Sequence, residues 1–179
     1  TVEELKASRD PVNSGDNYSG KTVTLNANLD LSGETNWTPI GTSSRPFKGT
    51  FDGGNHVIYN LTINTDNRYC GLFGYIDGAV LQNLGIEDAK IASTDTDVAI
   101  LSGYAGRSNI KRCYVTGSVK GYAAVSGLLG STYDGVTAVE NCYARVDLTP
   151  TVDRGDTAGI SGWNSKSSIQ IVNCYSACI

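Results

Sequence analysis

Three tyrosines with a common neighbour are the residues of this sequence best suited to recognition. Tyr114, Tyr143 and Tyr175 each directly follow a cysteine in a segment that occurs three times. Successive residues of a strand point to opposite faces, so an inward cysteine places the next tyrosine outward. Stacked copies would then form a flat aromatic strip that contacts sugar rings or another protein. The alternative is that the ladder only stabilises the sheet, through contacts on one face.

Catalytic chemistry has one candidate segment, FDGGNHV at 51–57, which contains Asp52 and His56, the only histidine. Polysaccharide cleavage on a β-helix needs two or three carboxylates from adjacent coils and a nearby basic residue. The acidic residues of this chain fall at unrelated repeat positions, without a matched arginine or lysine. We therefore interpret FDGGNHV as a Gly-Gly turn with an exposed His56, and we predict no catalytic residue and no enzyme.

Two loops contain short motifs with possible binding roles. Arg154, Gly155 and Asp156 resemble the integrin-binding tripeptide, although such a triplet also arises by chance in a chain of this length. Asp95 and Asp97 in STDTDV could present carboxylates to calcium, but the other ligands of a calcium site are missing. We expect a solvated turn at these aspartates, and we predict no metal site and no cofactor.

The five cysteines follow the repeat rather than a metal-binding or disulfide pattern. Cys113, Cys142 and Cys174 occupy one inward column, where a cysteine acts as a small hydrophobic residue. A disulfide between adjacent coils is conceivable, but an in-register stack places the side chains poorly for it. No histidine or carboxylate stands at fixed spacing beside these thiols. We expect Cys70 to be a small inward residue and Cys178 to be an exposed thiol.

Two sequence blocks recur together and define the elements that position these residues. The first block reads CGLFG at 70–74, AILSG at 99–103, SGLLG at 126–130 and AGISG at 158–162. The second block reads LQNLGI at 81–86, IKRCYV at 110–115, VENCYA at 139–144 and IVNCYS at 171–176. Successive copies lie roughly 30 residues apart, which is the period of a solenoid.

Alternation with a period of two in the first block indicates strands. One phase contains an apolar column that starts at Leu72 and a glycine column that starts at Gly74, so this phase is expected to face inward. The other phase is mixed and is expected to face outward. It consists of Phe73, Ser102, Leu129 and Ser161.

The second block contains a slip in parity that predicts a bend. Its inward columns lie first three and then two residues apart, and the residue at the slip is nearly always Asn, a type that tolerates the left-handed region. These bend positions are Asn60, Asn83, Arg112, Asn141 and Asn173. Two short strands that meet at such a bend describe a parallel β-helix. A leucine-rich repeat is the rival fold, but this chain lacks its conserved Asn position and its helix-like return.

The glycine-bracketed blocks, with NWTPIGTSSRPFKGTFDGGNHVIYNLTI at 36–63 before them, resemble the GLUG-repeat family of bacterial cell-surface adhesins, which is also found beside IgA-peptidase modules. The resemblance covers nearly the whole chain, and AILSG at 99–103 departs from it by lacking the first glycine. It implies a right-handed parallel β-helix and a location at the cell surface.

The predicted fold is therefore an all-β, right-handed parallel β-helix of about five coils with a short N-terminal capping helix. We expect a single domain over residues 1–179, divided into a cap at 1–20, first coils at 21–68 and GLUG-type repeats at 69–179. Thr1 to Glu4 form a capping box, so the helix should run to about Arg9 and stop at Pro11. NCYSACI ends in mid-repeat, which predicts a longer parent chain or a last coil that pairs with another molecule.

Composition excludes several partners. The 14 basic residues are scattered singly in a chain of net charge −4, which argues against nucleic acid, and no apolar run is long enough to span a membrane. The predicted function is a non-catalytic, extracellular, adhesin-like module of a bacterial surface protein that recognises a host or cell-surface glycan or protein. The alternatives are a polysaccharide-active lyase or hydrolase, and a pure stalk that binds no ligand and is attached to a peptidase.

Overall fold

The computed structural model describes residues 1–153, 155–165 and 169–179. The described residues form one helix, α1, and a series of short and long strands that follow it. The elements are α1 (Val2–Ser14), β1 (Thr22–Thr24), β2 (Leu29–Asp30), β3 (Thr50–Tyr59), β4 (Thr62–Thr65), β5 (Phe73–Asp77), β6 (Val80–Ser93), β7 (Val98–Ala99), β8 (Ser102–Gly106), β9 (Asn109–Gly121), β10 (Val125–Ser126), β11 (Leu129–Tyr133), β12 (Thr137–Glu140), β13 (Tyr143–Pro150), β14 (Thr157–Ala158), β15 (Ser161–Ser165), β16 (Ile169–Val172) and β17 (Tyr175–Ser176).

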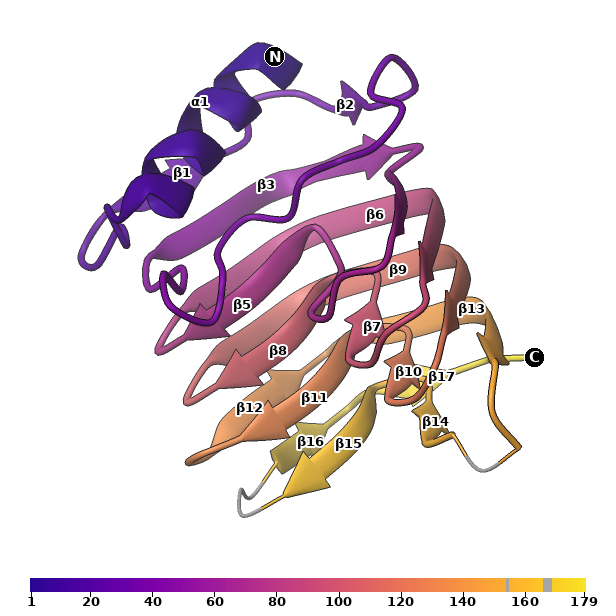
Figure 1. Cartoon of the computed structure of the whole chain (residues 1–179). Helices are drawn as coiled ribbons and strands as arrows, with labels where there is room; N and C mark the ends of the chain where they lie inside the picture. The colour runs from indigo at the N-terminus through magenta and orange to yellow at the C-terminus, as the bar shows by residue number, and fades with distance from the viewer. Residues whose placement is uncertain (154, 166–168) are drawn as a thin grey trace.

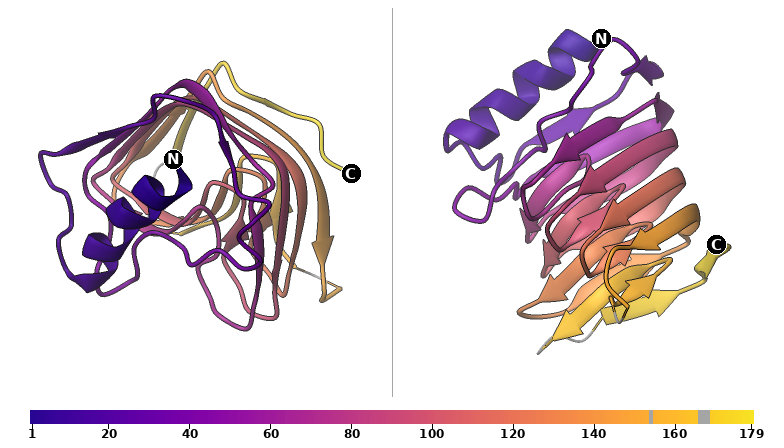
Figure 2. Two further views of the ribbon diagram at one scale, coloured as in Figure 1. Left: turned by 90° about the horizontal axis from the view of Figure 1, so that it is seen from above. Right: turned by 45° about the vertical axis from the view of Figure 1, so that its right-hand side comes forward.

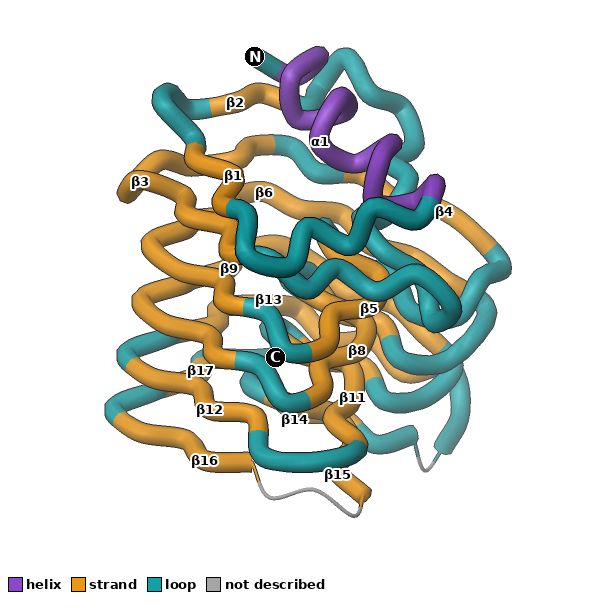
Figure 3. The backbone as a smooth tube through the Cα atoms, turned by 90° about the vertical axis from the view of Figure 1, so that its left-hand side faces the viewer, coloured by secondary structure: helices purple, strands orange, loops and turns teal. Residues whose placement is uncertain are grey.

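The strands stack in parallel and wind into a β-solenoid of about five turns (Figure 1). A large sheet follows the order β1-β3-β6-β9-β12-β16, and two smaller sheets follow the orders β15-β11-β8-β5 and β14-β10-β7. Figure 3 shows the equivalent strands of successive coils stacked one below another along the large sheet. The predicted parallel β-helix with an N-terminal helix is confirmed, and the leucine-rich repeat is excluded.

The bend between the two strands of the second block is confirmed. All five bend positions have a positive φ, between 49° at Arg112 and 60° at Asn60. This left-handed backbone turns the chain at one corner of each coil, and Asn adopts it at lower cost than most residues because its short polar side chain bonds locally. The parity slip in the sequence is therefore a structural corner, which we call the asparagine corner.

The predicted phases of the first block are partly wrong. Leu72 is buried as expected, but Phe73 is also buried, against Phe47 and Phe51, with ring centroids 5.3 Å apart in both pairs. Its sister positions Ser102 and Leu129 are fully buried as well. The chain bends around the core at this block, so consecutive residues on both phases are covered. What looked like an outward position is part of the core.

The glycine column marks close contact between segments of backbone. A Cβ at Gly103 would lie 2.5 Å from the backbone of Tyr69, and one at Gly130 would lie 2.5 Å from the carbonyl oxygen of Gly103. Real Cβ atoms do not approach backbone so closely, and a positive φ is not the reason for glycine at these positions. We call this second bend, at Gly74, Gly103, Gly130 and Gly162, the glycine corner.

Helix α1 covers the first coil and is longer than the sequence predicts. The capping box between Thr1 and Glu4 is confirmed. The predicted end near Arg9 is wrong, because the helix continues through Pro11 to Ser14 and ends at Gly15 in the left-handed conformation. The extra turn buries Val12, which is 1% exposed, and this packing outweighs the hydrogen bond that proline cannot donate. In the described part of the chain, no helix is long and apolar enough to cross a membrane.

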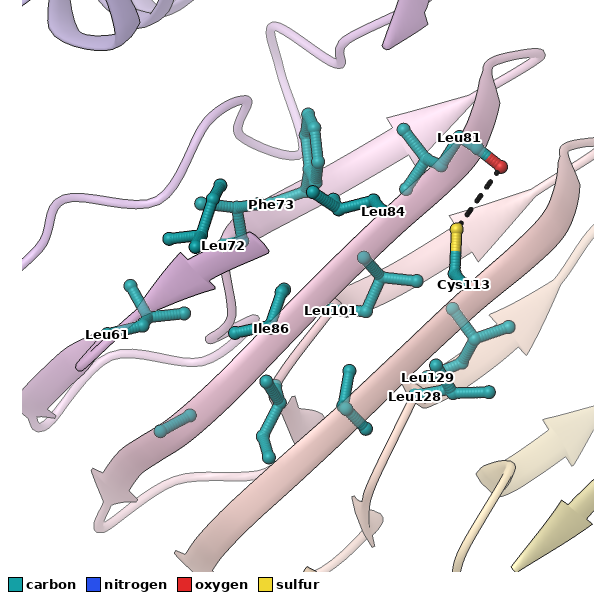
Figure 4. Close-up of a cluster of buried hydrophobic side chains, with 14 of the residues drawn as sticks. Leu61, Leu72, Phe73, Leu81, Leu84, Ile86, Leu101, Cys113, Leu128 and Leu129 are labelled. Carbon is teal, nitrogen blue, oxygen red and sulfur yellow. Dashed lines mark hydrogen bonds between the residues drawn. The ribbon is translucent and has the colours of Figure 1, made fainter. Parts of the chain in front are cut away.

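Helix α1 lies across the end of the coils (Figure 2), and the hydrophobic core fills the inside of the solenoid beneath it. The inward columns of the second block are buried through the middle coils, and Figure 4 shows Leu81, Leu84 and Cys113 within this core. In the last coil the side chain of Ile171 is 48% exposed, although it is in register with Val139. The column pattern thus continues to the end, while burial declines.

Candidate recognition surface

The predicted tyrosine ladder exists. Tyr114 of β9, Tyr143 of β13 and Tyr175 of β17 are in register on successive coils. Their ring centroids lie 4.8 Å and 5.1 Å apart, and neighbouring planes differ by 9° and 7°. The separations match the distance between adjacent strands, so the coil repeat itself holds the rings parallel. The ladder is a rigid strip, and its exposed parts are ring edges and hydroxyl groups because the faces between the rings are covered.

The two ends of the ladder differ. At the upper end, the ring of Tyr114 lies over Gly85, where a Cβ would come within 2.5 Å of the ring. Its hydroxyl donates a 2.6 Å hydrogen bond to Glu87. Burial, aided by this bond to a carboxylate, raises the pKa of Tyr114 well above its ordinary value. At the lower end, Tyr175 is 63% exposed. A ligand therefore has most access at Tyr143 and Tyr175.

The candidate catalytic segment is a bulge rather than a turn. Asp52 and His56 both lie in β3, and the pairing of β3 with β6 shifts register between them. The interpretation as a Gly-Gly turn is wrong, because the positive φ at Gly54 and Asn55 inserts extra residues into a continuing strand. His56 is half-buried, and its Nδ1 lies 3.3 Å from the side-chain oxygen of Asn28.

The carboxylate of Asp52 is engaged in structural hydrogen bonds. It accepts from the side chains of Asn83 (2.9 Å) and Gln82 (2.7 Å) and from the N–H of Gly54 (2.9 Å). These bonds, led by the one from Asn83, lower the pKa of Asp52. A carboxyl group held ionised in this way suits anchoring of the asparagine corner better than donation of a proton in general acid catalysis.

The aspartates of STDTDV have separate environments. Asp97 is buried, 1% exposed, and its carboxylate pairs with the guanidinium of Arg68 and accepts a 2.7 Å hydrogen bond from Thr96. The expected solvated turn is therefore wrong for Asp97, because its carboxylate is held by Arg68 and Thr96 and not by water. Asp95 is half-buried. The described residues contain no group of three or more His, Cys, Asp or Glu side chains arranged to hold a metal ion.

The Arg-Gly-Asp segment is only partly visible. Arg154 lies outside the described residues. Gly155 is half-buried and Asp156 is exposed, and the carbonyl of Asp156 accepts a 2.9 Å hydrogen bond from the N–H of Val125. That bond belongs to the pairing of β10 with β14. The adhesion role of this segment stays a prediction.

The cysteine column is confirmed as part of the interior at Cys113 and Cys142, which are 1% exposed, whereas Cys174 in the last coil is half-buried. The N–H of Cys113 lies 3.4 Å from the sulfur of Cys142, and the N–H of Cys142 lies 3.4 Å from the sulfur of Cys174. All five cysteines are free thiols. Burial raises the pKa of Cys70 to about 11, so this thiol is unreactive at neutral pH. Cys178 is half-buried against the core, not exposed as expected, because the last segment continues parallel to β13 and hydrogen-bonds to it.

A second aromatic cluster was missed by sequence reasoning. Tyr75 and Tyr104 stack with centroids 3.9 Å apart, and the ring of Tyr69 meets both edge-on. The hydroxyl of Tyr104, which is 6% exposed, donates to the carbonyl of Tyr133. The signal was present, because Tyr75 and Tyr104 each follow a repeat glycine. This cluster is mostly covered and supports the glycine corner.

The chain is similar to one known protein in sequence and to another in structure. Halomucin of Haloquadratum walsbyi is 32% identical over 121 residues, which are 60% of this chain and 1% of halomucin. The solved structure of a candidate immunoglobulin A1 protease from Bacteroides ovatus is similar, with a TM-score of 0.69 and 22% identity, over 99% of this chain and 65% of that chain. No family profile matches the chain. Nearly all of this chain therefore shares the fold of the Bacteroides protein, and it spans about two thirds of that protein's length.

Proposed function

We propose that this chain is a non-catalytic module of an extracellular, adhesin-like bacterial surface protein. In this proposal the β-helix is a scaffold of the GLUG type, and its outward columns recognise a host or cell-surface glycan or protein. The observation that supports it best is the ladder of Tyr114, Tyr143 and Tyr175, three parallel rings at separations of 4.8 Å and 5.1 Å on one face.

The ladder suits recognition because it is ordered before a ligand arrives. Rings that stack on one another lose little conformational freedom on binding, which reduces the entropic cost of association. The hydroxyls of Tyr143 and Tyr175 offer hydrogen bonds one coil apart, whereas that of Tyr114 already donates to Glu87, and the exposed ring of Tyr175 offers an apolar surface. A polymer with a repeating unit, such as a glycan chain or an extended peptide, fits a repeating surface of this kind.

The comparisons support the setting of this proposal and not its chemistry. The fold is shared with a protein described as a candidate immunoglobulin A1 protease, and this chain covers 65% of it. A β-helix next to a peptidase would be a spacer or a recognition module for the same target. Halomucin supports the same setting, because the segment that is 32% identical to this chain makes up 1% of its length. In that protein, such a segment is a small part of a long chain.

A glycan array and a protein pull-down with the folded chain test the proposal. The triple variant Tyr114→Ala, Tyr143→Ala and Tyr175→Ala is expected to lose binding that the wild-type chain shows. Tyr122→Ala is the matched control, because Tyr122 is 50% exposed but lies outside the ladder. Circular dichroism and thermal unfolding show whether each variant is folded. Binding that persists in the folded triple variant would remove the ladder from the proposal.

The two alternatives predict different results in the same samples. A polysaccharide-active enzyme would release new chain ends from acidic polysaccharides, and this release would disappear in Asp52→Ala or His56→Ala. A stalk without a ligand would show neither release nor binding. Binding without release supports the proposed module.

A further inference from the structure

A groove between the first two coils lies outside every site predicted from the sequence. Its volume is about 510 Å³, which is in the range of pockets that hold small ligands. One wall is the segment 36–43, the other is the segment 63–70, and Asn13 at the end of α1 contributes from the side. Most of the lining residues have polar side chains, although the exposed surface of the groove is more apolar than polar, and Trp37, which is 2% exposed, contributes little of it.

The groove is a consequence of how the first coil is built. In later coils a corner loop lies on the loop of the next coil, since Tyr69 donates to the carbonyl of Thr96 and Asp97 to that of Ala123. The first coil has no such loop. The backbone N–H of Trp37 donates to the carbonyl of Thr62, and that of Ile40 donates to the carbonyl of Leu72. In the first coil, residues 38–39 therefore bridge a distance that the second coil bridges with the longer segment 63–71. The loop of the second coil is therefore left uncovered.

The main charged group in the groove is the guanidinium of Arg68. Its Nε donates to the buried carboxylate of Asp97, and the guanidinium lies over the ring of Tyr69, 4.6 Å from the centroid. The side chain is 50% exposed, and among the described residues no hydrogen-bond partner is found for its two terminal nitrogens. Asp97 and Tyr69 thus fix the orientation of the fork, and its outer edge stays available for a planar anion.

A second guanidinium stands at the rim. Nη1 of Arg45 donates a 2.7 Å hydrogen bond to the carbonyl of Asn13, and the backbone N–H of Arg45 donates to the carbonyl of Thr42. Asn13 and Thr42 both line the groove. Arg45 is exposed and forms no ion pair with a described carboxylate. Arg45 therefore adds a positive charge at the rim that no described carboxylate pairs with, in a chain whose net charge is −4.

We infer that this groove binds an acidic saccharide, with the sugar carboxylate on the terminal nitrogens of Arg68. The hydroxyls of Thr42 and Ser43 and the amide of Asn67 line the same groove and suit the hydroxyl groups of a sugar. The site lies in the first two coils, whereas the tyrosine ladder belongs to the last three. The inference does not rest on the ladder, and it supplies a ligand class that the ladder does not.

Calorimetric titration with two pairs of sugars tests the inference. The acidic probes are trigalacturonate and 3′-sialyllactose, and their neutral counterparts are the methyl ester of trigalacturonate and lactose. At low salt, at least one acidic probe is expected to bind about tenfold more tightly than its neutral counterpart, as a charge-assisted bidentate contact requires. Equal binding of acidic and neutral forms, or no binding of either acidic probe at 10 mM (roughly the limit for a useful site), overturns the inference.

Two neighbouring serines give a matched pair that locates the binding. Ser43 and Ser44 are both exposed, but only Ser43 lines the groove. Ser43→Trp places a large side chain in the groove and is expected to weaken acidic-sugar binding about tenfold or more, whereas Ser44→Trp leaves it unchanged. Equal affinities of the two variants would place the sugar elsewhere on the chain.

The role of Arg68 is tested without leaving a buried charge. The double variant Arg68→Gln with Asp97→Asn removes both partners of the ion pair, and asparagine tolerates the positive φ of 62° at position 97. We expect the discrimination between acidic and neutral sugar to disappear while thermal unfolding still shows a folded chain. A folded double variant that keeps this discrimination contradicts the assignment of Arg68.

Discussion

The two corners of each coil use special residues for different physical reasons. At the asparagine corner the backbone has a positive φ, from 49° to 60°, and side chains of Asn or Arg are accepted because there is room for them. At the glycine corner φ is ordinary, and the space for a Cβ is filled by backbone of a neighbouring segment. The backbone conformation limits the residue type at the asparagine corner, whereas the lack of space for a Cβ limits it at the glycine corner.

This difference predicts which substitutions each corner tolerates. A residue that adopts the left-handed region is sufficient at the asparagine corner, and the chain itself uses two types there. At the glycine corner no side chain fits, whatever its conformational preference. The experiments below test this contrast, from the largest expected effect to the smallest.

Gly130→Val is expected to have the largest effect. A Cβ at Gly130 would lie 2.5 Å from the carbonyl oxygen of Gly103 and 2.6 Å from the backbone of Asp97, so two coils would have to separate. The expected loss is at least about 4 kcal/mol in the free energy of unfolding, measured by urea denaturation. Gly33→Ala is the control, because nothing lies within 4 Å of a Cβ there. Similar losses in both variants would contradict the role of space.

Phe73→Ser tests the residue beside the corner. The ring of Phe73 is fully buried against Phe47 and Phe51, so its removal leaves a cavity and a buried hydroxyl. A loss of about 3–5 kcal/mol is expected from denaturant unfolding. Serine at the sister position 102 is stable because its hydroxyl bonds to the carbonyl of Tyr104, 2.7 Å away. A loss under about 1 kcal/mol would restore the outward interpretation of Phe73.

Asn141→Ala isolates the conformational cost at the other corner. Asn141 has a φ of 54° and an exposed side chain, so the substitution removes little packing. Alanine in the left-handed region is expected to cost about 1–2 kcal/mol, which thermal unfolding detects as a lower melting temperature. An unchanged melting temperature would mean that the positive φ is not costly for alanine at this corner.

A smaller effect is expected from acid at the same corner. Hydrogen bonds from Asn83 and Gly54 lower the pKa of Asp52 from its ordinary value of 3.8. A carboxyl with a lowered pKa stabilises the folded state above its ordinary pKa, and this contribution is lost as the pH falls through the folded value. Between pH 6 and pH 3 the wild-type melting temperature should therefore fall more than that of Asp52→Asn. Parallel curves for the two proteins would exclude this contribution.

The sequence predicted the asparagine corner because its parity slip is visible in a single chain. It also predicted the stacked tyrosines, because period two and coil register place Tyr114, Tyr143 and Tyr175 without further information. At the glycine corner the sequence showed only a column of glycines. Close backbone contact and a positive φ both select glycine, so the sequence could not tell which of the two causes applies. Phe73 was misplaced because both phases are covered where the chain bends around the core.

The groove and the true length of α1 were beyond sequence reasoning for a related cause. Both depend on which segments lie against the first coil, and no periodic pattern carries that information. Pro11 suggests a helix end by local rules, but the burial of Val12 extends the helix. Arg68 is one scattered basic residue in the sequence, and only the structure shows that Asp97 and Tyr69 hold it at an uncovered corner.

The most direct test of the account is an exchange of residue types between the two corners, followed by urea unfolding. Asn141→Gly should change the free energy of unfolding by less than about 1 kcal/mol, because glycine adopts the positive φ freely. Gly103→Asn should cost at least about 3 kcal/mol, because the backbone conformation at position 103 suits any residue but a Cβ there meets the backbone of Tyr69 at 2.5 Å. Small changes in both variants would contradict the claim that backbone contact at the glycine corner holds the coils together.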